Sequence, residues 1–378
     1  MAAVTARKTQ RYVVMSLCVV VIVGLVGIVV RQSLAINSNS RHTVREEQEG
    51  ADLLHPMTAV LGELVTAQSA AVRGEAVNAA AVRQALAAVA SEDDQHGPGL
   101  GTHDLFVDLR NKVEAELGRS ETGRAAFDTY SSLVTLAVGL MKQIGDRSNL
   151  IHDPDLDSYY LMDAAVIQLP VAVVLAGRAS DLVALANGRP LQGEDAIRAA
   201  VARFDVSDSA EKVDGDLSIT VATTERAELG GNIASSLDTF KDAADAFSPP
   251  TMLLELSSTV DASTLAANAR RVSAAATPLA HRLLYELQEL LDARAARLAT
   301  ELRITAVSTA LAGLLLLVLV YMVLVGNTKP VMPVEAPPAE AAPWGVGGSG
   351  VPRHRTEPDE LVTAGRSGRW SREAGDAQ

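Results

Sequence analysis

Two long stretches of the sequence carry no charged side chain, and they limit the folds open to this chain more than any other feature. Residues 13–30 read VVMSLCVVVIVGLVGIVV, and Ile304–Thr328 form a second uncharged run whose residues 310–325 are almost entirely apolar. Eighteen residues of helix reach about 27 Å, the thickness of the hydrocarbon core of a bilayer. Apolar stretches of this length are rare in soluble domains, so we expect transmembrane helices at 13–30 and 304–326.

The first stretch has an alternative interpretation as a cleaved signal peptide. Ser33 and Ala35 have the small-x-small spacing that a signal peptidase needs, but the apolar run is longer than the roughly 7–15 residues that are usual. Cys18 lies near the start of the run, whereas a lipidated cysteine would follow it. We therefore expect Cys18 to act as a small apolar residue within a membrane helix.

The charges before the first span predict its orientation. Arg7, Lys8 and Arg11 precede it without any acidic residue, which indicates a cytoplasmic N-terminus. Residues 1–12 and 327–378 would then lie in the cytoplasm and residues 31–303 outside it, with the protein in the cell (inner or plasma) membrane. Residues 31–303 hold 24 Lys and Arg against 39 Asp and Glu, a net charge of −15. This acidity keeps a domain soluble and repels an anionic membrane surface.

The composition favours helices and excludes several classes of protein. Aromatic residues make up 3% of the chain and hydrophobic residues 48%, so the apolar content is mostly Ala, Val and Leu, as in close-packed helices. A net charge of −13 argues against a nucleic-acid partner, and one cysteine excludes an internal disulfide. Glycine-rich phosphate loops, H-E-x-x-H, G-x-S-x-G and Cys/His pairs are absent from the sequence, so we predict neither an enzyme nor a cofactor.

Apolar spacing and helix breakers divide residues 31–303 into long helices. We expect Pro56 to kink the first of them and the Gly/Pro-rich loop 95–103 to follow it. The expected helices cover 36–91, 104–117, 121–147, 154–186, 192–206 and 208–247, and a last one runs from the N-cap residue Thr251 into the second span. An apolar stripe on this last helix, typical of a bundle seam, consists of Leu279, Leu283, Leu287, Leu290 and Leu291. The predicted fold class is all-α: an elongated helical bundle flanked by two transmembrane helices, with a disordered C-terminal tail.

The most distinctive segment is DRSNLIHDPDLDSYYLMDAAVIQLP, at positions 146–170. Asp153 is of the N-cap type and Pro154 suits the first helical position, while Asp155 and Asp157 would lie near the positive end of the helix dipole. A well-capped helix whose tyrosines pack between neighbours explains this pattern. The side chains expected to project from its early turns are Tyr159, Tyr160, Asp163 and Ile167.

A metal site in this segment is not predicted. Asp153, Asp155 and Asp157 match the start of a calcium loop, but its sixth and twelfth positions are Ser158 and Ala164 instead of Gly and Glu. Elsewhere in the segment, one histidine at position 152 has no second histidine at metal-ligand spacing.

The motif DPDLDSYYLMD followed by Leu-Pro resembles a motif in the extracytoplasmic helical sensor domains of bacterial methyl-accepting chemotaxis receptors and sensor histidine kinases. The likeness covers roughly Leu53–Gly326. It implies two stacked four-helix bundles, a homodimer formed through long helices, and binding of a small molecule, often an organic anion. The chain departs from these receptors after Gly326, where no kinase, cyclase or methyl-accepting helix fits the sequence.

Five residues are candidate contacts for such a ligand. Arginine can hold a carboxylate through two hydrogen bonds, and tyrosine can hydrogen-bond or stack. Solvation or packing on helix surfaces explains the same residues equally well. The candidates are Arg147, Asn149, Tyr159, Tyr160 and Arg178.

Residues 328–378 are rich in Pro, Gly, Ala and Glu, which predicts disorder. Trp344 and Trp370 would anchor a cytoplasmic partner there, unless they are chance aromatics in a linker. Arg353 and Arg355 precede Thr356, a pattern that suits a basophilic kinase, so Thr356 is a candidate phosphosite.

Two functions fit these observations. The first is a two-span membrane protein that binds a small ligand outside the cell and signals through a separate cytoplasmic partner. The alternative is a non-enzymatic scaffold in the lipid bilayer that assembles partners through its helical rod and its tail.

Overall fold

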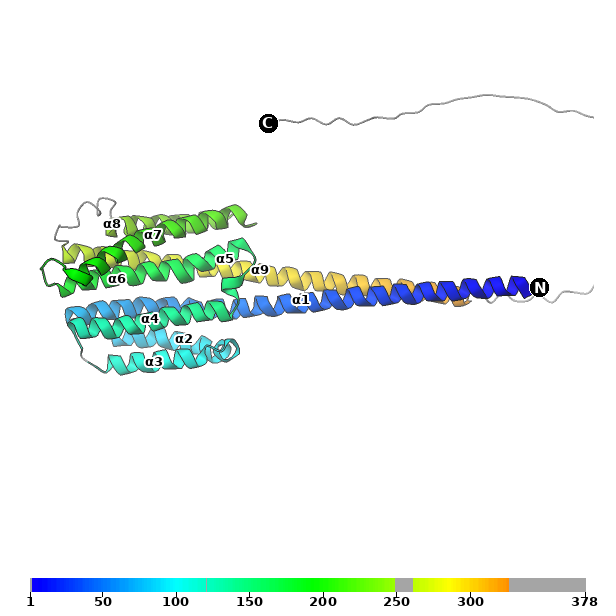
Figure 1. Ribbon diagram of the computed structural model, residues 1–378, viewed down its shortest axis with the longest axis horizontal. Helices are drawn as coiled ribbons and strands as arrows, with labels where there is room; N and C mark the ends of the chain where they lie inside the picture. Colours follow the sequence, from blue (N-terminus) through cyan, green and yellow to red (C-terminus); the bar gives the residue numbers. More distant parts are fainter. Residues whose placement is uncertain (1, 120, 249–260, 326–378) are drawn as a thin grey trace, which may run out of the picture. The chain divides into compact units, whose positions relative to one another are not determined.

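The computed structural model describes residues 2–119, 121–248 and 261–325, and in these residues every regular element is a helix (Figure 1). The predicted all-α class is therefore confirmed for the described part of the chain. Within these described residues, the nine α-helices are α1 (Ala2–Arg73), α2 (Ala79–Leu100), α3 (His103–Leu117), α4 (Gly123–Arg147), α5 (Leu156–Met162), α6 (Leu169–Leu185), α7 (Gly193–Thr223), α8 (Leu229–Phe247) and α9 (Ala262–Val325). A 3₁₀ turn, η1 (Leu150–His152), precedes α5, and a π-helical turn, η2 (Asp163–Gln168), joins α5 to α6.

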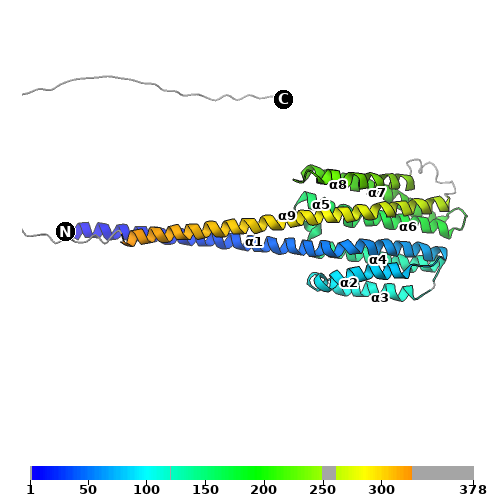
Figure 2. The same ribbon diagram turned by 180° about the vertical axis from the view of Figure 1, so that it is seen from behind.

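The helices within residues 2–318 form two four-helix groups that lie side by side (Figures 1 and 2). In the first group, α1 packs against α2 and α4, and α3 packs against α2 and α4. In the second group, α7 packs against the continuous helix α5–η2–α6 and against α8, while α9 is bonded to α8 by Asn232 and Glu286. Contacts of α6 with α1 and α4 join the two groups, and one apolar core runs through both.

The first predicted helix is divided in a place that the sequence analysis missed. We expected one helix over 36–91, but α1 ends at Arg73 and α2 begins at Ala79. Gly74 adopts a left-handed conformation with φ 71°, which ends α1, and the Asn78 side chain accepts a hydrogen bond from the Ala81 amide to cap α2. The chain thereby reverses direction, and α2 returns along α1.

The prediction of a loop at 95–103 is wrong for most of that segment, which is helical. Helix α2 continues through Gly97 and Pro98 to Leu100, because only Gly101 leaves helical geometry, with φ 68°. Within a single residue, Thr102, the chain then enters α3. A second boundary is also corrected: α7 continues past residue 207 to Thr223, and the break before α8 falls at 224–228.

Helix α9 begins after Asp261, whose carboxylate accepts hydrogen bonds from the backbone amides of Ser263 and Thr264. The same carboxylate accepts hydrogen bonds from the hydroxyl groups of Ser263 and Thr264, and these bonds, followed by the backbone ones, hold the pKa of Asp261 well below its usual range. The predicted start at Thr251 lies outside the described residues. The predicted leucine stripe is confirmed, because Leu279, Leu283, Leu287, Leu290 and Leu291 are all buried.

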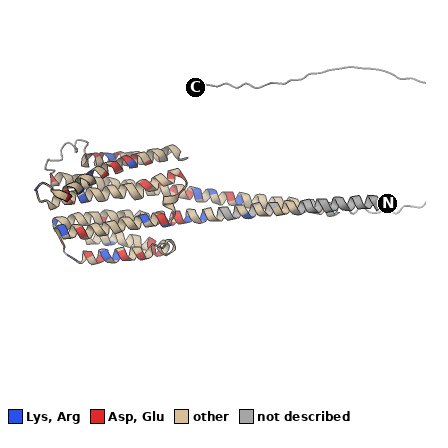
Figure 3. Ribbon diagram, in the orientation of Figure 1, with Lys and Arg blue, Asp and Glu red and all other residues tan. Residues whose placement is uncertain are grey.

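By length and composition, two described stretches of helix are apolar enough to cross a membrane. The stretch Leu156–Leu185 has 67% of its most apolar window buried inside the protein, so it is a core helix. The stretch Ala262–Met322 has none of its most apolar window buried. Charged side chains are spread over the helices of both groups, whereas α9 has none after Arg303 (Figure 3).

Candidate functional site

Four pairs of polar side chains connect α1 to α9 along their contact. The pairs are Glu47 with Arg294, Gln48 with Asp292, Asp52 with Gln288, and His55 with His281, at 3.2, 2.5, 2.6 and 2.9 Å. We call these eight residues the polar seam. The leucine stripe of α9 packs into the apolar core, so the polar seam occupies a different part of the surface of α9.

The histidine pair lies where the polar seam meets the apolar interior. The Nδ1 atoms of His55 and His281 are 2.9 Å apart, and the ring centroids are 4.7 Å apart. Since two protonated rings cannot share this contact, one nitrogen donates its proton and the other accepts. Burial, and secondarily the charge of His55, lowers the pKa of His281. His281 is therefore neutral over a wider range of pH than a solvated histidine.

Asp52 extends this network to α2. Its Oδ1 atom accepts a hydrogen bond from Gln288, and its Oδ2 atom is 3.9 Å from Nε2 of His96. Nε2 of His96 also lies 3.8 Å from a carboxylate oxygen of Glu92. Burial raises the pKa of Asp52, while His96 opposes that shift. Polar side chains of α1, α2 and α9 thus meet at Asp52.

At the opposite end of the polar seam, Arg294 holds the distinctive sequence motif. Its Nη1 atom donates to both carboxylate oxygens of Asp153 at 3.1 Å and to Glu47 at 3.2 Å. Its Nη2 atom donates to Ser158 at 2.8 Å and lies 2.6 Å from an oxygen of Asp155. We call Glu47, Asp153, Asp155, Ser158 and Arg294 the arginine cluster.

The arginine cluster contains more negative charge than its single cation can neutralise. The side chains of Glu47 and Asp153 are 1% and 0% exposed, and that of Arg294 is 15% exposed. Burial, followed by the charge of Asp153, raises the pKa of Glu47 to about 8. Glu47 is consequently protonated in the folded protein near neutral pH.

This geometry corrects the predicted role of Asp153. The residue before α5 is Asp155, not Asp153, and the helix starts at Leu156 instead of Pro154. Oδ1 of Asp153 accepts a bond from the Asp155 amide and forms a turn, while the same carboxylate binds Arg294. Asp157 accepts a bond from the Ser158 amide at 2.9 Å. The motif therefore fastens a loop to α9.

The remaining acid of the motif, Asp163, begins the π-helical turn. Gln168 donates a hydrogen bond of 2.9 Å to Asp163, and Asp216 on α7 approaches the same carboxyl group. Burial, and then the charge of Asp163, raises the pKa of Asp216 to about 7. Oδ2 of Asp216 is buried, and no nitrogen or hydroxyl donor of the described residues reaches it; the hydrogen-bonding neighbour of Asp216 is the carboxyl group of Asp163.

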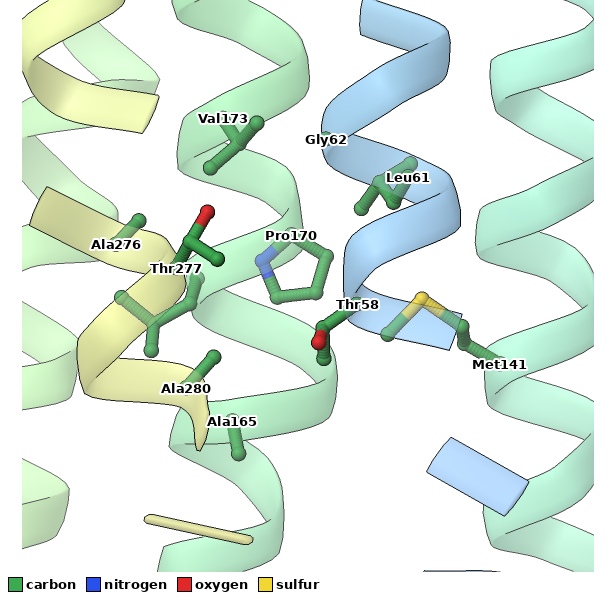
Figure 4. A pocket seen from close by; sticks show the side chains of 11 residues that line it. Thr58, Leu61, Gly62, Met141, Ala165, Pro170, Val173, Ala276, Thr277 and Ala280 are labelled. Carbon is green, nitrogen blue, oxygen red and sulfur yellow. The ribbon is translucent and has the colours of Figure 1, made fainter. Parts of the chain in front are cut away.

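A small cavity lies where α1, α4, α6 and α9 meet (Figure 4). Its volume is about 20 Å³, which is enough for one water-sized sphere. The hydroxyls in its wall belong to Thr58 and Thr277, and both donate to carbonyl oxygens of their own helices, His55 and Ser273. The other walls are apolar or small: Leu61, Gly62, Met141, Ala165, Leu169, Pro170, Val173, Ala276 and Ala280.

A larger groove of about 520 Å³ lies between α2 and α3. Arg83 crosses it and donates to both carboxylate oxygens of Glu114, at 3.2 and 3.0 Å. Arg110 lies beside it with its guanidinium 5.8 Å from the centre of the Phe106 ring. The lining residues are Arg83, Leu86, Ala87, Ala90, Ser91, Asp94, Arg110 and Glu114.

Four of the five predicted ligand contacts lie near the junction of α4 and α5, and each has a structural neighbour. Arg147 is exposed and lies against Gly101. Asn149 adopts φ 65° and donates to Glu46 at 3.1 Å. Tyr159 and Tyr160 contact each other edge to face at 5.1 Å, and Tyr159 packs against the core.

The fifth, Arg178, is held elsewhere. Its Nη2 atom donates to the Ser131 carbonyl at 3.0 Å and to the Thr135 hydroxyl at 2.8 Å, and burial lowers its pKa. Arg147 lies twelve residues after Thr135 on α4, which is about 18 Å along the helix. The structure thus does not bring the five residues together in one site, and Arg178 joins α6 to α4.

Within the described residues, no group of three or more His, Cys, Asp or Glu side chains is arranged to hold a metal ion. His152 pairs with Asp146 at 3.2 Å. Thr356 and the predicted tail lie outside the described residues.

Sequence patterns alone did not predict the places of Glu47, His55 and His281 or the role of Arg294. A signal for two of them was present: Arg294 continues the spacing of Leu287 and Leu291, and Glu47 precedes Leu54 by seven residues. A charged residue in register with a buried stripe indicates a buried ion pair.

No family model matches the chain, and neither the curated proteins nor the solved structures contain a match to it.

Proposed function

We propose that this protein is a two-span membrane protein whose helical domain transmits a change of state through the α1/α9 pair. The observation that carries the proposal is the outward apolar surface of both helices. On α9, Ile304, Val307 and Leu317 are 63%, 68% and 67% exposed, and on α1, Val21 and Ile28 are also exposed. Large exposed apolar surfaces are unfavourable in water and indicate contact with a membrane or a protein.

The exposed apolar side chains of α1 and α9 also support the proposal that these two helices anchor the protein in a membrane. Both surfaces fall in uncharged stretches that are long enough for a bilayer, and three positive charges precede the first. We propose that the protein is anchored in the cell membrane by these two helices. Both termini would then lie in the cytoplasm and the helical domain on the opposite side of the membrane.

Cysteine accessibility tests this topology. In a Cys18→Ala background, single cysteines are introduced as Ser91→Cys in the domain and Thr5→Cys near the N-terminus, and intact cells are treated with a membrane-impermeant maleimide. We expect labelling at position 91 in intact cells and at position 5 only after lysis. The reverse pattern, or labelling of neither position before lysis, would reject the topology.

The polar seam supports the transmitting role. It joins α1 to α9 through four hydrogen-bonded pairs, and the arginine cluster also ties both helices to the loop before α5. A rearrangement in the domain that alters these bonds would shift one helix relative to the other, and small axial or rotational shifts of this kind carry signals in proteins.

Distance measurements between spin labels test the transmission. Labels are placed at two exposed positions, Val21→Cys and Leu311→Cys, in the full chain without Cys18. We expect Arg294→Gln to shift or broaden the distance distribution. The matched control is Arg297→Gln, because Arg297 is 58% exposed and pairs with Glu225, which is 87% exposed. Equal distributions in all three proteins would instead favour a static scaffold.

A small organic anion remains the proposed input, and the groove between α2 and α3 is its proposed site. Arg110 supplies a cationic donor there, whereas Arg83 is paired with Glu114, and the volume of about 520 Å³ suits a small molecule. Thermal-shift screening of the full chain against organic anions tests this input. We expect a stabilising compound whose effect is lost in Arg110→Gln and kept in the control Arg270→Gln, an exposed residue of α9. An effect that both variants keep would place the anion elsewhere.

A further inference from the structure

We propose that His55 and His281 form a binding site for a zinc-class divalent transition metal, because their Nδ1 atoms face each other across the α1/α9 contact at 2.9 Å. This inference goes beyond the proposed function. Metal binding by the pair does not depend on where the domain lies or on what it transmits.

The spacing of the two nitrogens is close to the one a metal needs. Zinc binds histidine nitrogens at about 2.0–2.1 Å in tetrahedral geometry, so two such ligands are about 3.3 Å apart. The rings therefore need to separate by only a few tenths of an ångström. Since α1 and α9 are fixed by the core and by the other pairs of the polar seam, the two imidazoles are already in place before a metal arrives.

The chemical state of the pair also suits a metal. Zinc binds neutral imidazole, and the lowered pKa of His281 keeps that ring neutral. In the metal-free pair, one of the two facing nitrogens carries a proton and donates a hydrogen bond to the other. A metal would take the place of that proton, which is released to solvent.

The surroundings orient the site and leave part of it open. The Thr58 hydroxyl is 3.5 Å from Nε2 of His281 and can bond the nitrogen that faces away from the metal, as outer partners of ligating histidines do. The acidic groups of this region are Asp52, one turn before His55 on α1, and Glu92 on α2, with His96 between them. Because no third ligand joins the pair within the described residues, water would complete the coordination and the metal would exchange readily.

The consequence of binding is mechanical. One ligand comes from α1 and the other from α9, so a bound ion would tie together the two helices that leave the domain. Such a tie lies beside Thr58, which also lines the cavity where the two helix groups meet.

Zinc titration of the full chain in detergent, purified without a polyhistidine tag, tests the site. We expect one equivalent of Zn²⁺ to raise the melting temperature of the wild type, Mg²⁺ to have no effect, and the zinc Kd to rise at least about tenfold in His55→Gln and in His281→Gln. His152→Gln is the matched control, because His152 is exposed and pairs with Asp146. Retention of the zinc effect in His281→Gln, or its loss in His96→Gln alone, would overturn the assignment.

A second measurement keeps the test valid if a variant does not fold. Wild-type protein is modified with diethylpyrocarbonate with and without Zn²⁺, and each histidine is followed by mass spectrometry. We expect Zn²⁺ to protect His55 and His281 and to leave His152 unchanged. Equal modification of His55 and His281 in both conditions would reject the site.

Discussion

Glu47 and Asp153 are buried carboxyl groups that share one guanidinium, so the positive charge beside them is too small to neutralise both. Removing two carboxylates from water costs far more than one arginine restores, so one of them keeps its proton. The pKa of Glu47, about 8, is well above that of a solvated glutamate. The groups around it are Glu46 on α1, Asp153 and Asp155 in the loop, and Arg294 on α9.

We predict that Glu47→Gln reduces the loss of stability as pH rises. The folded protein binds this proton more tightly than the unfolded chain, so its contribution to the free energy of unfolding is complete below about pH 4.5 and is lost as pH rises through about 8. The slope is at most about 1.4 kcal/mol per pH unit. Glutamine resembles the protonated acid and still accepts a bond from Arg294, so the variant should be the more stable protein at pH 9. Urea unfolding of both proteins from pH 5 to 9 measures this, and parallel curves would contradict it.

Removal of the cation should be more harmful than removal of an exposed arginine on the same helix. Arg294→Met leaves Glu47, Asp153 and Asp155 without their common partner, and breaking a buried ion pair costs about 3–5 kcal/mol. Arg297→Met removes only an exposed pair, which contributes about 0–1 kcal/mol. Denaturant midpoints of the two variants compare these costs directly. A loss of equal size in both would show that Arg294 is not a buried anchor.

How far the sequence predicts this site depends on the residue. Asp153, Asp155 and Asp157 stand out because acids crowd beside a proline, and their association with a helix start was predictable. Their partner Arg294 lies 141 positions from Asp153, and no local rule connects the two. His55 and His281 are 226 positions apart and belong to no motif, so only the fold reveals that their rings meet.

At the scale of the helices, the successful predictions depended on unambiguous end signals. The helices predicted over 104–117 and 121–147 agree with α3 and α4 to within two residues. Three glycines and a proline at 97–101 suggested a loop, yet burial of Gly97 and Leu100 keeps that stretch helical. Conversely, the turn at 74–78 has one glycine, and the apolar spacing of α1 and α2 hides it. Tertiary packing decided both cases.

Gly101 and Gly99 provide a matched test of where α2 ends. Gly101 adopts φ 68°, so alanine there is strained, and its Cβ would also lie 3.3 Å from the Arg147 guanidinium. Gly99 is within the helix with nothing near its missing Cβ. We expect Gly101→Ala to lower the free energy of unfolding by about 1 kcal/mol and Gly99→Ala to raise it by about 0.5–1 kcal/mol. Thermal unfolding of both variants measures these changes. If Gly99→Ala destabilised the protein and Gly101→Ala stabilised it, α2 would end earlier, within the loop predicted at 95–103.

At the scale of the whole molecule, the core and the apolar stretches are separate. Every buried apolar side chain among the described residues falls between Val44 and Leu291, whereas the described apolar side chains at 21–28 and 304–318 are mostly exposed. Folding of the domain therefore does not draw on the proposed spans. The core consists mostly of leucine, valine and alanine side chains, and the polar seam and the arginine cluster add hydrogen bonds and ion pairs between α1 and α9.

A fragment of residues 38–303 should consequently fold in water without detergent. It keeps the whole core, both four-helix groups and the polar seam, and it loses the exposed apolar surfaces that would make the chain aggregate. We expect a soluble, cooperatively melting helical protein by circular dichroism, with Glu47→Gln having the same effect on its pH dependence as in the full chain. Extending the fragment to residues 21–318 restores those surfaces and should make detergent necessary. A fragment of 38–303 that aggregates or loses its helicity would show that the apolar stretches support the domain and do not merely hold it at a membrane.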